Sequence, residues 1–461
     1  MEEKTEFSNM QGHTVTNLRN SLGRFRKIAL IWMGIGLSLP LWAFGGQQNS
    51  TVFSQIPDNG RARVENLDYI TAPLYELTPN SRIIDDPMTG FRVRMRVEVQ
   101  EARGFTYIIF ENEVREPDRS LGIFPLVGAG NFVIRRNHED GKIDQIKVFL
   151  GQGPHVYLRL SPQKVKSTAS FYAYNDQEAL FNNLPLPVSI ERVLGLPTRD
   201  LLFLLEGSIQ WASLIPRGNS YDYEFIQEMV QKLREELPHL PDAEDGAMDD
   251  QGRLVKIESM LSTGLPGFNC SGFAKWVADG VYHELTGSYL GIPSLKQKHL
   301  DLRGSALALE LEDLRDPYFG LDWTRNIATA INTRHYGVQL EPEDSDVRTV
   351  PFFEYVEDLG YPVRDLWQIM YFLALDNPGS WYLGSVNGEF GQDPVLWQHY
   401  HVVVFFPYID DQGNFRVVVM ERNLETGIDN LIRRYPQEYM HLVQLPSISV
   451  DSGFEPPKIE Y

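Results

Sequence analysis

The chain has 461 residues, a formal net charge of −20 and one cysteine. This acidic balance argues against nucleic acid or an anionic lipid surface as the main partner, because both attract basic proteins. Hydrophobic residues make up 43% of the chain, which excludes an intrinsically disordered protein. At roughly 100–200 residues per domain, we expect two or three domains.

The N-terminus has the pattern of an export segment. Residues 28–44 carry no charge and follow four basic residues, Arg19, Arg24, Arg26 and Lys27. A basic region, an apolar region and small residues near Ala43 and Gly45 are typical of a secretory signal. The apolar run also approaches the length of a membrane span, so an uncleaved anchor is the alternative. Residues 1–45 therefore predict an exported protein that is periplasmic or associated with the cell envelope.

The first half of the remaining chain favours β-structure. Residues 46–65 are polar and mixed, and we expect a flexible lead-in. From 66 to 205, short β-type runs alternate with turn signals; residues 91–99 alternate strictly, and Asp140-Gly141 is a hairpin signal. We predict a β-rich accessory domain, built as a small sandwich or barrel.

Residues 206–461 have a different pattern. Helical periodicity occurs in residues 223–237 and 271–285, with further helices expected at 296–313, 323–333 and 363–375. Two apolar strands follow, residues 401–406 and 415–421. Helices followed by an antiparallel sheet predict an α+β domain.

Cys270 is the strongest candidate for chemistry. Exported proteins normally hold cysteines in disulfides, whereas this cysteine has no partner. Phe273, Trp276, Val277 and Val281 form one apolar helical stripe, which places Cys270 at the first turn of a helix. Unpaired backbone N–H groups and the helix dipole stabilise a thiolate there. The alternative is a small buried side chain without chemistry.

A thiolate nucleophile needs a base, usually His, and a third polar group that orients the base. His401 opens an apolar strand, an unusual place for a polar side chain. A hairpin centred at residue 411 or 412 puts His401 opposite Glu421 or Asn423, which share one face because strand side chains alternate. Either residue would orient the imidazole.

Other polar residues are weaker candidates. His399 is two residues from His401 on the same face and is the substitute base. His283 lies more than three turns beyond Cys270 and is interpreted as structural. The acidic segment 238–252 lacks the ligand spacing of a calcium loop, and the sequence has no zinc-ligand cluster and no phosphate-binding loop. We therefore expect no metal and no cofactor.

Three segments resemble one family. Asn269-Cys-Ser-Gly-Phe-Ala-Lys-Trp-Val277 resembles the Asp-Cys-Ser-Gly signature of the NlpC-type cell-wall cysteine peptidases, which have a papain-like fold. His401-Val-Val-Val-Phe405 resembles their His-Val-Gly-Ile-Tyr strand. Asn377-Pro-Gly-Ser-Trp-Tyr382 resembles their Pro-Gly-Asp segment, which opens the central sheet. The three segments follow the family's order along the chain.

The resemblance implies a role for each matching residue. Cys270 would attack an amide of a peptidoglycan stem peptide, with His401 as base and Glu421 or Asn423 as the third residue. The substrate-binding residues would be Asn269, Ser271 and Ser380. Two of these depart from the family pattern, since Asn269 and Ser380 stand where the family has Asp. A large insertion must also separate Cys270 from His401.

The sequence thus predicts an exported cysteine hydrolase that cleaves an amide in a cell-envelope peptide, with peptidoglycan implied by the resemblance. Two alternatives remain open. The papain-like domain could be an inactive binding or scaffold module, which the missing acidic residues at 269 and 380 favour. An acyltransferase would use the same three residues. The sequence leaves the oligomeric state open.

Overall fold

A computed structural model describes residues 53–459, except 88–89, 115–123, 125, 217–219, 261–266, 300–315, 391–395 and 449–452. The described residues belong to one compact unit. The predicted export segment, residues 1–45, lies outside them. Among the helices that are described, none is long and apolar enough to cross a membrane.

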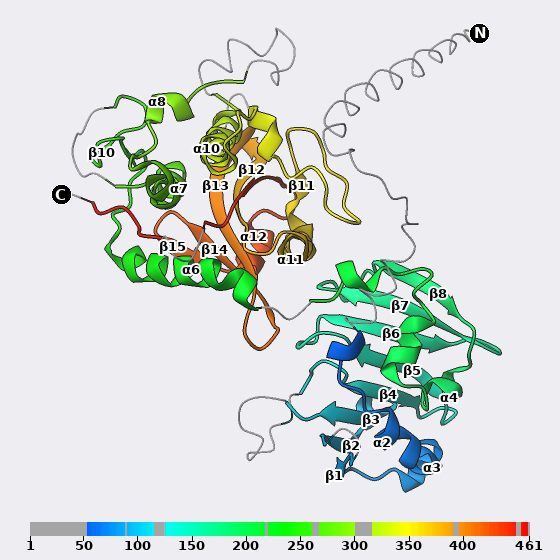
Figure 1. Cartoon of the computed structure of the whole chain (residues 1–461). Helices are drawn as coiled ribbons and strands as arrows, with labels where there is room; N and C mark the ends of the chain where they lie inside the picture. Colours follow the sequence, from blue (N-terminus) through cyan, green and yellow to red (C-terminus); the bar gives the residue numbers. More distant parts are fainter. Residues whose placement is uncertain are drawn as a thin grey trace, which may run out of the picture. The chain divides into compact units, whose positions relative to one another are not determined.

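The first half forms one antiparallel sheet of eight strands in sequence order (Figure 1). Each strand pairs with its neighbours in the chain, so that β1 and β8 form the two edges. The strands are β1 (Asn80–Asp85), β2 (Arg92–Gln100), β3 (Phe105–Asn112), β4 (Phe132–Asn137), β5 (Ile143–Phe149), β6 (Val156–Pro162), β7 (Ser167–Ala173) and β8 (Phe181–Leu186).

Short helices cover one face of this sheet. Alternate strand residues such as Met95, Ile134 and Leu158 are fully buried in one apolar cluster. The same cluster takes apolar residues from α2 (Gly60–Glu65), α3 (Leu67–Thr71), α4 (Ile190–Val193) and α5 (Thr198–Phe203). The expected sandwich or barrel was wrong: helices, not a second sheet, bury the apolar face, and among the described residues no pairing of β1 with β8 closes the sheet.

The expected flexible lead-in is also corrected where residues 53–65 are described. Phe53 and Ile56 are buried in the core of the first sheet. Arg63 is fully buried, its guanidinium donates to the Asn59 side chain and to the Leu194 carbonyl, and it lies 4.0 Å from the centre of the Phe132 ring. These contacts fix the segment as part of the domain.

The second half contains a six-stranded antiparallel sheet in the order β11-β16-β12-β13-β14-β15. Its strands are β11 (Tyr361–Pro362), β12 (Trp381–Phe390), β13 (Leu396–Ile409), β14 (Phe415–Glu421), β15 (Leu424–Thr426) and β16 (Tyr439–Leu445). The helices are α6 (Glu224–Glu236), α7 (Cys270–Thr286), α8 (Ile292–Leu295), α10 (Phe319–Tyr336), α11 (Leu366–Asp376) and α12 (Ile428–Arg434); a short hairpin pairs β9 (Ala247–Met248) with β10 (Leu254–Val255).

Helices pack on both faces of this sheet. Val402 and Val404 of β13 point into the cluster that contains residues of α7 and α10. Val403 and Phe405 point the other way, into the cluster with residues of α11 and α12. The predicted α+β class is confirmed at this level, because both halves combine helices with antiparallel sheets.

Several predicted elements match the structure closely. Helices α6 and α7 and strand β14 begin and end within about one residue of the predicted bounds. Helix α10 is longer than the predicted 323–333. Of the helix expected at 296–313, only residues 296–299 are described, and they are not helical; the remainder lies outside the described residues.

The start of α7 packs tightly against the backbone before β9. A Cβ added at Gly272 would lie 1.9 Å from the carbonyl oxygen of Gly246 and 2.9 Å from the Cα of Ala247. These contacts are with main-chain atoms, which cannot rotate away. Only a residue without a side chain therefore lets the first turn of α7 approach this backbone so closely.

Replacing Gly272 by Ala should therefore destabilise the protein by about 1–3 kcal/mol, the usual cost of overpacking. Denaturant unfolding of the variant measures this loss. Gly207→Ala is the matched control, because an added Cβ there meets no atom within 4 Å. Equal stability of the two variants would contradict the close packing at Gly272.

Candidate active site

The first turn of α7 is held in place by side chains on both sides of Cys270. The side-chain oxygen of Asn269 accepts the Gly272 backbone N–H at 2.8 Å and caps the helix. The indole N–H of Trp323 on α10 donates to the Ser271 carbonyl at 2.9 Å. The half-buried thiol of Cys270 lies 4.0 Å from the Ser271 hydroxyl. Helix α7 thus presents Cys270 from a fixed position.

Strand β13 reaches the thiol where its neighbour β14 stops. The first paired residues of these two strands are Val404 and Met420, so the hairpin is centred at 412, as predicted. His401 lies beyond the last pair, where the edge of β13 is open, and α7 packs against β13 (Figure 1). The backbone N–H of Val402 at this edge is one of the groups that lower the pKa of Cys270.

His401 links the thiol to a carboxylate. Its Nε2 lies 2.5 Å from Oε2 of Glu421, and its imidazole also interacts with the Cys270 thiol. Because Nε2 is engaged by Glu421, Nδ1 is the ring nitrogen that remains for the sulfur. The second oxygen of Glu421 accepts from the guanidinium of Arg434. The carboxylate is therefore anchored independently of the histidine.

The electrostatics favour an ion pair between Cys270 and His401. Burial opposes the thiolate, but interaction with His401 and the Val402 N–H outweighs it and lowers the pKa of Cys270 below its ordinary value. Burial also opposes the imidazolium, yet Cys270 and Glu421 raise the pKa of His401 to about 9. Although burial disfavours its charge too, the pKa of Glu421 is lowered by His401 and Arg434. Each of the three pKa shifts thus favours the charged form of its group.

A cleft of about 1050 Å³ opens over these residues. Asn269, Cys270, Ser271, His401 and Glu421 all line it. Its walls carry both signs of charge, from Glu244, Asp245, Glu258, Asp316, Lys296, Lys298, Arg422 and Arg434. The cleft is large enough for an extended polar substrate rather than a single small molecule.

Two predicted site residues are not brought to this cleft. The side-chain amide of Asn423 donates to the Leu240 carbonyl, so Glu421 and not Asn423 contacts His401. The turn after β14 explains this, because Arg422 has a φ of 53° and interrupts the alternation of the strand. Ser380 is 8% exposed at the start of β12, and its hydroxyl accepts from the Gln444 side chain. Neither residue lines the cleft.

The substitute base, His399, also lines the cleft, but one of its ring nitrogens is bound to a serine hydroxyl. Nδ1 of His399 lies 2.6 Å from the Ser385 hydroxyl. Burial and the nearby His441 and Arg325 hold the pKa of His399 well below 6.5, so this imidazole is neutral. His283, interpreted as structural, stacks on the Tyr289 ring at 5.0 Å.

Three contributors to the site were not predicted. Arg434 anchors Glu421, the Tyr435 ring lies 6.0 Å from the His401 ring, and the Val402 N–H reaches the thiol. Arg434 and Tyr435 come from the end of α12, about a dozen residues after Glu421 in the sequence. A basic residue at a helix C-terminus is common for dipole reasons alone, so no local signal marks it as part of a site.

No metal centre is found in the described part of the chain, where His, Cys, Asp and Glu side chains form no group of three or more that could hold an ion. The cleft itself is lined by a thiol, an imidazole and a carboxylate, those of Cys270, His401 and Glu421.

Comparison with known proteins gives one match. Residues 52–213, which include the eight-stranded sheet, are similar to a family described as "Domain of unknown function (DUF8515)". The matched segment begins within the predicted lead-in and ends well before Cys270. Neither the curated proteins nor the solved structures contain a match to the chain.

The lowered pKa of Cys270 can be measured directly, because the chain has no other cysteine. The rate of alkylation by iodoacetamide should rise with a midpoint below about 8.5, the value of an ordinary thiol. Glu421→Gln should move this midpoint upward, since it weakens the imidazolium that stabilises the thiolate.

The control for this titration is the same protein in denaturant, where the midpoint should return to the ordinary value. A folded-state midpoint equal to the denatured one would show that Cys270 and His401 form no ion pair.

Proposed function

We propose that this protein is a cysteine hydrolase that cleaves an amide bond of a cell-envelope peptide. The observation that carries the proposal is the Cys270–His401–Glu421 arrangement, with the His401 nitrogen 2.5 Å from Glu421 and the thiol pKa lowered by the imidazole. The resemblance of the Cys270 and His401 segments to the NlpC-type peptidases supports a papain-like catalytic domain and a peptidoglycan stem peptide as substrate.

In the first half-reaction, the Cys270 thiolate attacks the amide carbonyl carbon and forms a C–S bond. The tetrahedral intermediate collapses when the C–N bond breaks, and the leaving amine takes the proton held on His401. The product is a thioester on Cys270 and a free amine. Glu421 keeps the imidazole oriented and stabilises its charge before the proton is transferred.

In the second half-reaction, a water molecule attacks the thioester carbonyl. Neutral His401 takes the proton from this water, the C–S bond breaks, and the peptide leaves as a carboxylic acid. The thiolate and imidazolium are then restored. An amine in place of water would make the same site an acyltransferase, so the identity of the products separates the two reactions.

The developing oxyanion needs donors near the sulfur. The backbone N–H of Cys270 is one candidate, because N–H groups in the first turn of a helix have no intrahelical acceptor. The helix dipole of α7 adds to this stabilisation. Asn269 also lines the cleft, where its side-chain oxygen caps α7. The second lone pair of this oxygen is available to a substrate amine.

Substituting Cys270, His401 and Glu421 in turn should distinguish a loss of catalysis from a loss of folding. Cys270→Ala and His401→Ala should abolish peptide release, and Glu421→Gln should lower kcat by about 10²–10⁴-fold. Asn423→Ala is the matched control with nearly unchanged kcat, because that amide contacts the Leu240 carbonyl and not His401. Mass spectrometry of fragments released from purified sacculi measures the reaction, and thermal unfolding checks that each variant is folded. Release by Cys270→Ala at the wild-type rate would rule out the mechanism.

The pH dependence of kcat/KM should be bell-shaped. The active form needs a deprotonated Cys270 and a protonated His401, so activity rises as the thiol ionises. Activity then falls as His401 loses its proton around its raised pKa of about 9. A profile that keeps rising well beyond pH 9 would contradict the imidazolium as the proton donor.

A further inference from the structure

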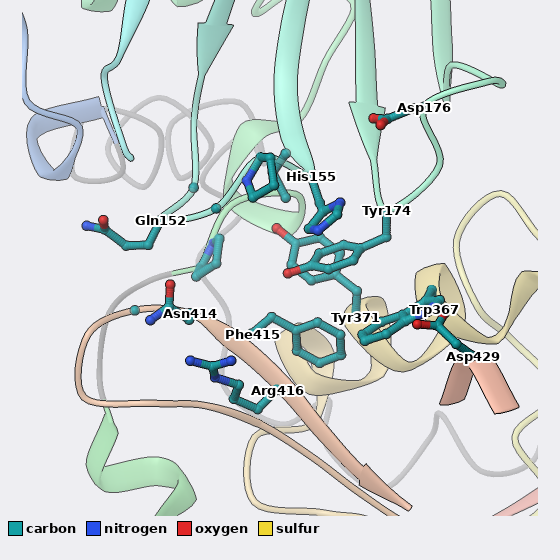
Figure 2. Close-up of a pocket in the computed structure, with 16 residues that line it drawn as sticks. Gln152, His155, Tyr174, Asp176, Trp367, Tyr371, Asn414, Phe415, Arg416 and Asp429 are labelled. Atoms are coloured by element: carbon teal, nitrogen blue, oxygen red, sulfur yellow. Dashed lines mark hydrogen bonds between the residues drawn. The ribbon is translucent and has the colours of Figure 1, made fainter. Parts of the chain in front are cut away.

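A second pocket lies apart from Cys270 and shares no lining residue with its cleft. It measures about 510 Å³, within the range of about 300–1,000 Å³ that is usual for small-molecule sites. Its walls come from the loop that follows β5, from Tyr174 after β7, from α11 and from the start of β14 (Figure 2). All of these segments belong to the same compact unit.

Aromatic rings form one wall of this pocket. Tyr174 stacks between His155, at 5.1 Å, and Trp367, at 5.6 Å with only 12° between the planes. Phe415 meets Tyr174 edge-on at 5.1 Å, and Tyr371 lies 5.0 Å from it. His155 is exposed and Trp367 is partly exposed, so this cluster is not sealed into the core. Figure 2 shows the rings gathered at one side of the pocket.

The backbone of Tyr174 adopts an unfavourable conformation in this wall of the pocket. Its φ is 52°, a left-handed conformation that is rare for a bulky residue. Such strain persists where the surrounding structure enforces it and is concentrated at binding and active sites. The Tyr174 backbone N–H donates to the His155 carbonyl at 2.9 Å, which fixes the two stacked residues together.

Planar polar side chains form the rim. Asp410 orients two of them, since it accepts from the Asn414 amide and from Nε of Arg416. These bonds use neither the amide oxygen of Asn414 nor the terminal nitrogens of Arg416. Asp429 accepts the indole N–H of Trp367 at 2.7 Å, which couples the rim to the aromatic wall. Gln152 adds a further amide.

This combination fits a saccharide. A pyranose ring offers a flat C–H face, which packs on aromatic rings, and a row of hydroxyls, which bond to amides, carboxylates and guanidinium groups. A phosphate ligand fits poorly, because Arg416 is paired with Asp410 and the pocket also contains Asp176 and Asp429. A wholly apolar ligand would leave the oriented rim groups unpaired. We propose that this aromatic pocket binds sugar residues of a glycan chain.

The proposal does not depend on the chemistry of Cys270, because none of the pocket residues takes part in it. It is tested by calorimetric titration of the full chain carrying Cys270→Ala. The probes are chitotetraose, cellotetraose and maltotetraose, with a ten-residue proline peptide as the competing class of aromatic-groove ligand. We expect one of the tetrasaccharides to bind, with Trp367→Ala and Arg416→Ala each weakening it by at least about tenfold.

Two controls keep the test decisive. Trp397→Ala removes a tryptophan that is 50% exposed outside the pocket and should leave the affinity unchanged. Alkylation of Cys270 in Trp367→Ala, made in the otherwise wild-type chain, should match the wild type and so report an intact fold. The proposal fails if no tetrasaccharide binds, if binding survives Trp367→Ala, or if only the proline peptide binds. Loss of peptide release in Cys270→Ala with sugar binding retained would separate this site from the proposed hydrolase.

Discussion

The site depends on one structural constraint: the first turn of α7 must meet β13 where β14 has ended. Had β14 paired three residues further, it would occupy the edge of β13 at which the Val402 N–H and His401 reach Cys270. The close backbone contact at Gly272, the Asn269 cap and the Trp323 hydrogen bond all act on the same turn. The thiol is therefore positioned by packing on α10 and β9 as much as by its own helix.

The site also depends on the charged contacts of Glu421 with His401 and Arg434. Glu421 is held by Arg434, so the carboxylate that orients His401 is itself fixed by a helix on the opposite face of the sheet from α7. The two faces thus contribute different parts: one carries Cys270, and the other supports Glu421. A preorganised chain of charges of this kind needs little rearrangement as the reaction proceeds.

The placing of Cys270 and His401 at one cleft was predictable because each residue lies in a local pattern. The apolar stripe after Cys270 predicted the helix. The turn between the two strands predicted the register that places His401 opposite Glu421 or Asn423. The choice between those two residues was not predictable, since it depends on the positive φ of Arg422. Helices over the first sheet were missed because Arg63 and Asn59 look like surface residues until their buried hydrogen bonds are known.

Asn269 caps the N-terminus of α7 with its side-chain amide oxygen. The NlpC-type peptidases, which this segment resembles, have a carboxylate at this position. Both groups can cap a helix, but only the carboxylate would place a negative charge one residue from the thiolate. A neutral N-cap residue satisfies the helix N-terminus without a negative charge that would raise the pKa of the neighbouring thiol. Burial then opposes ionisation of Cys270, whereas His401 and the Val402 N–H lower its pKa, in a protein whose overall charge is strongly negative.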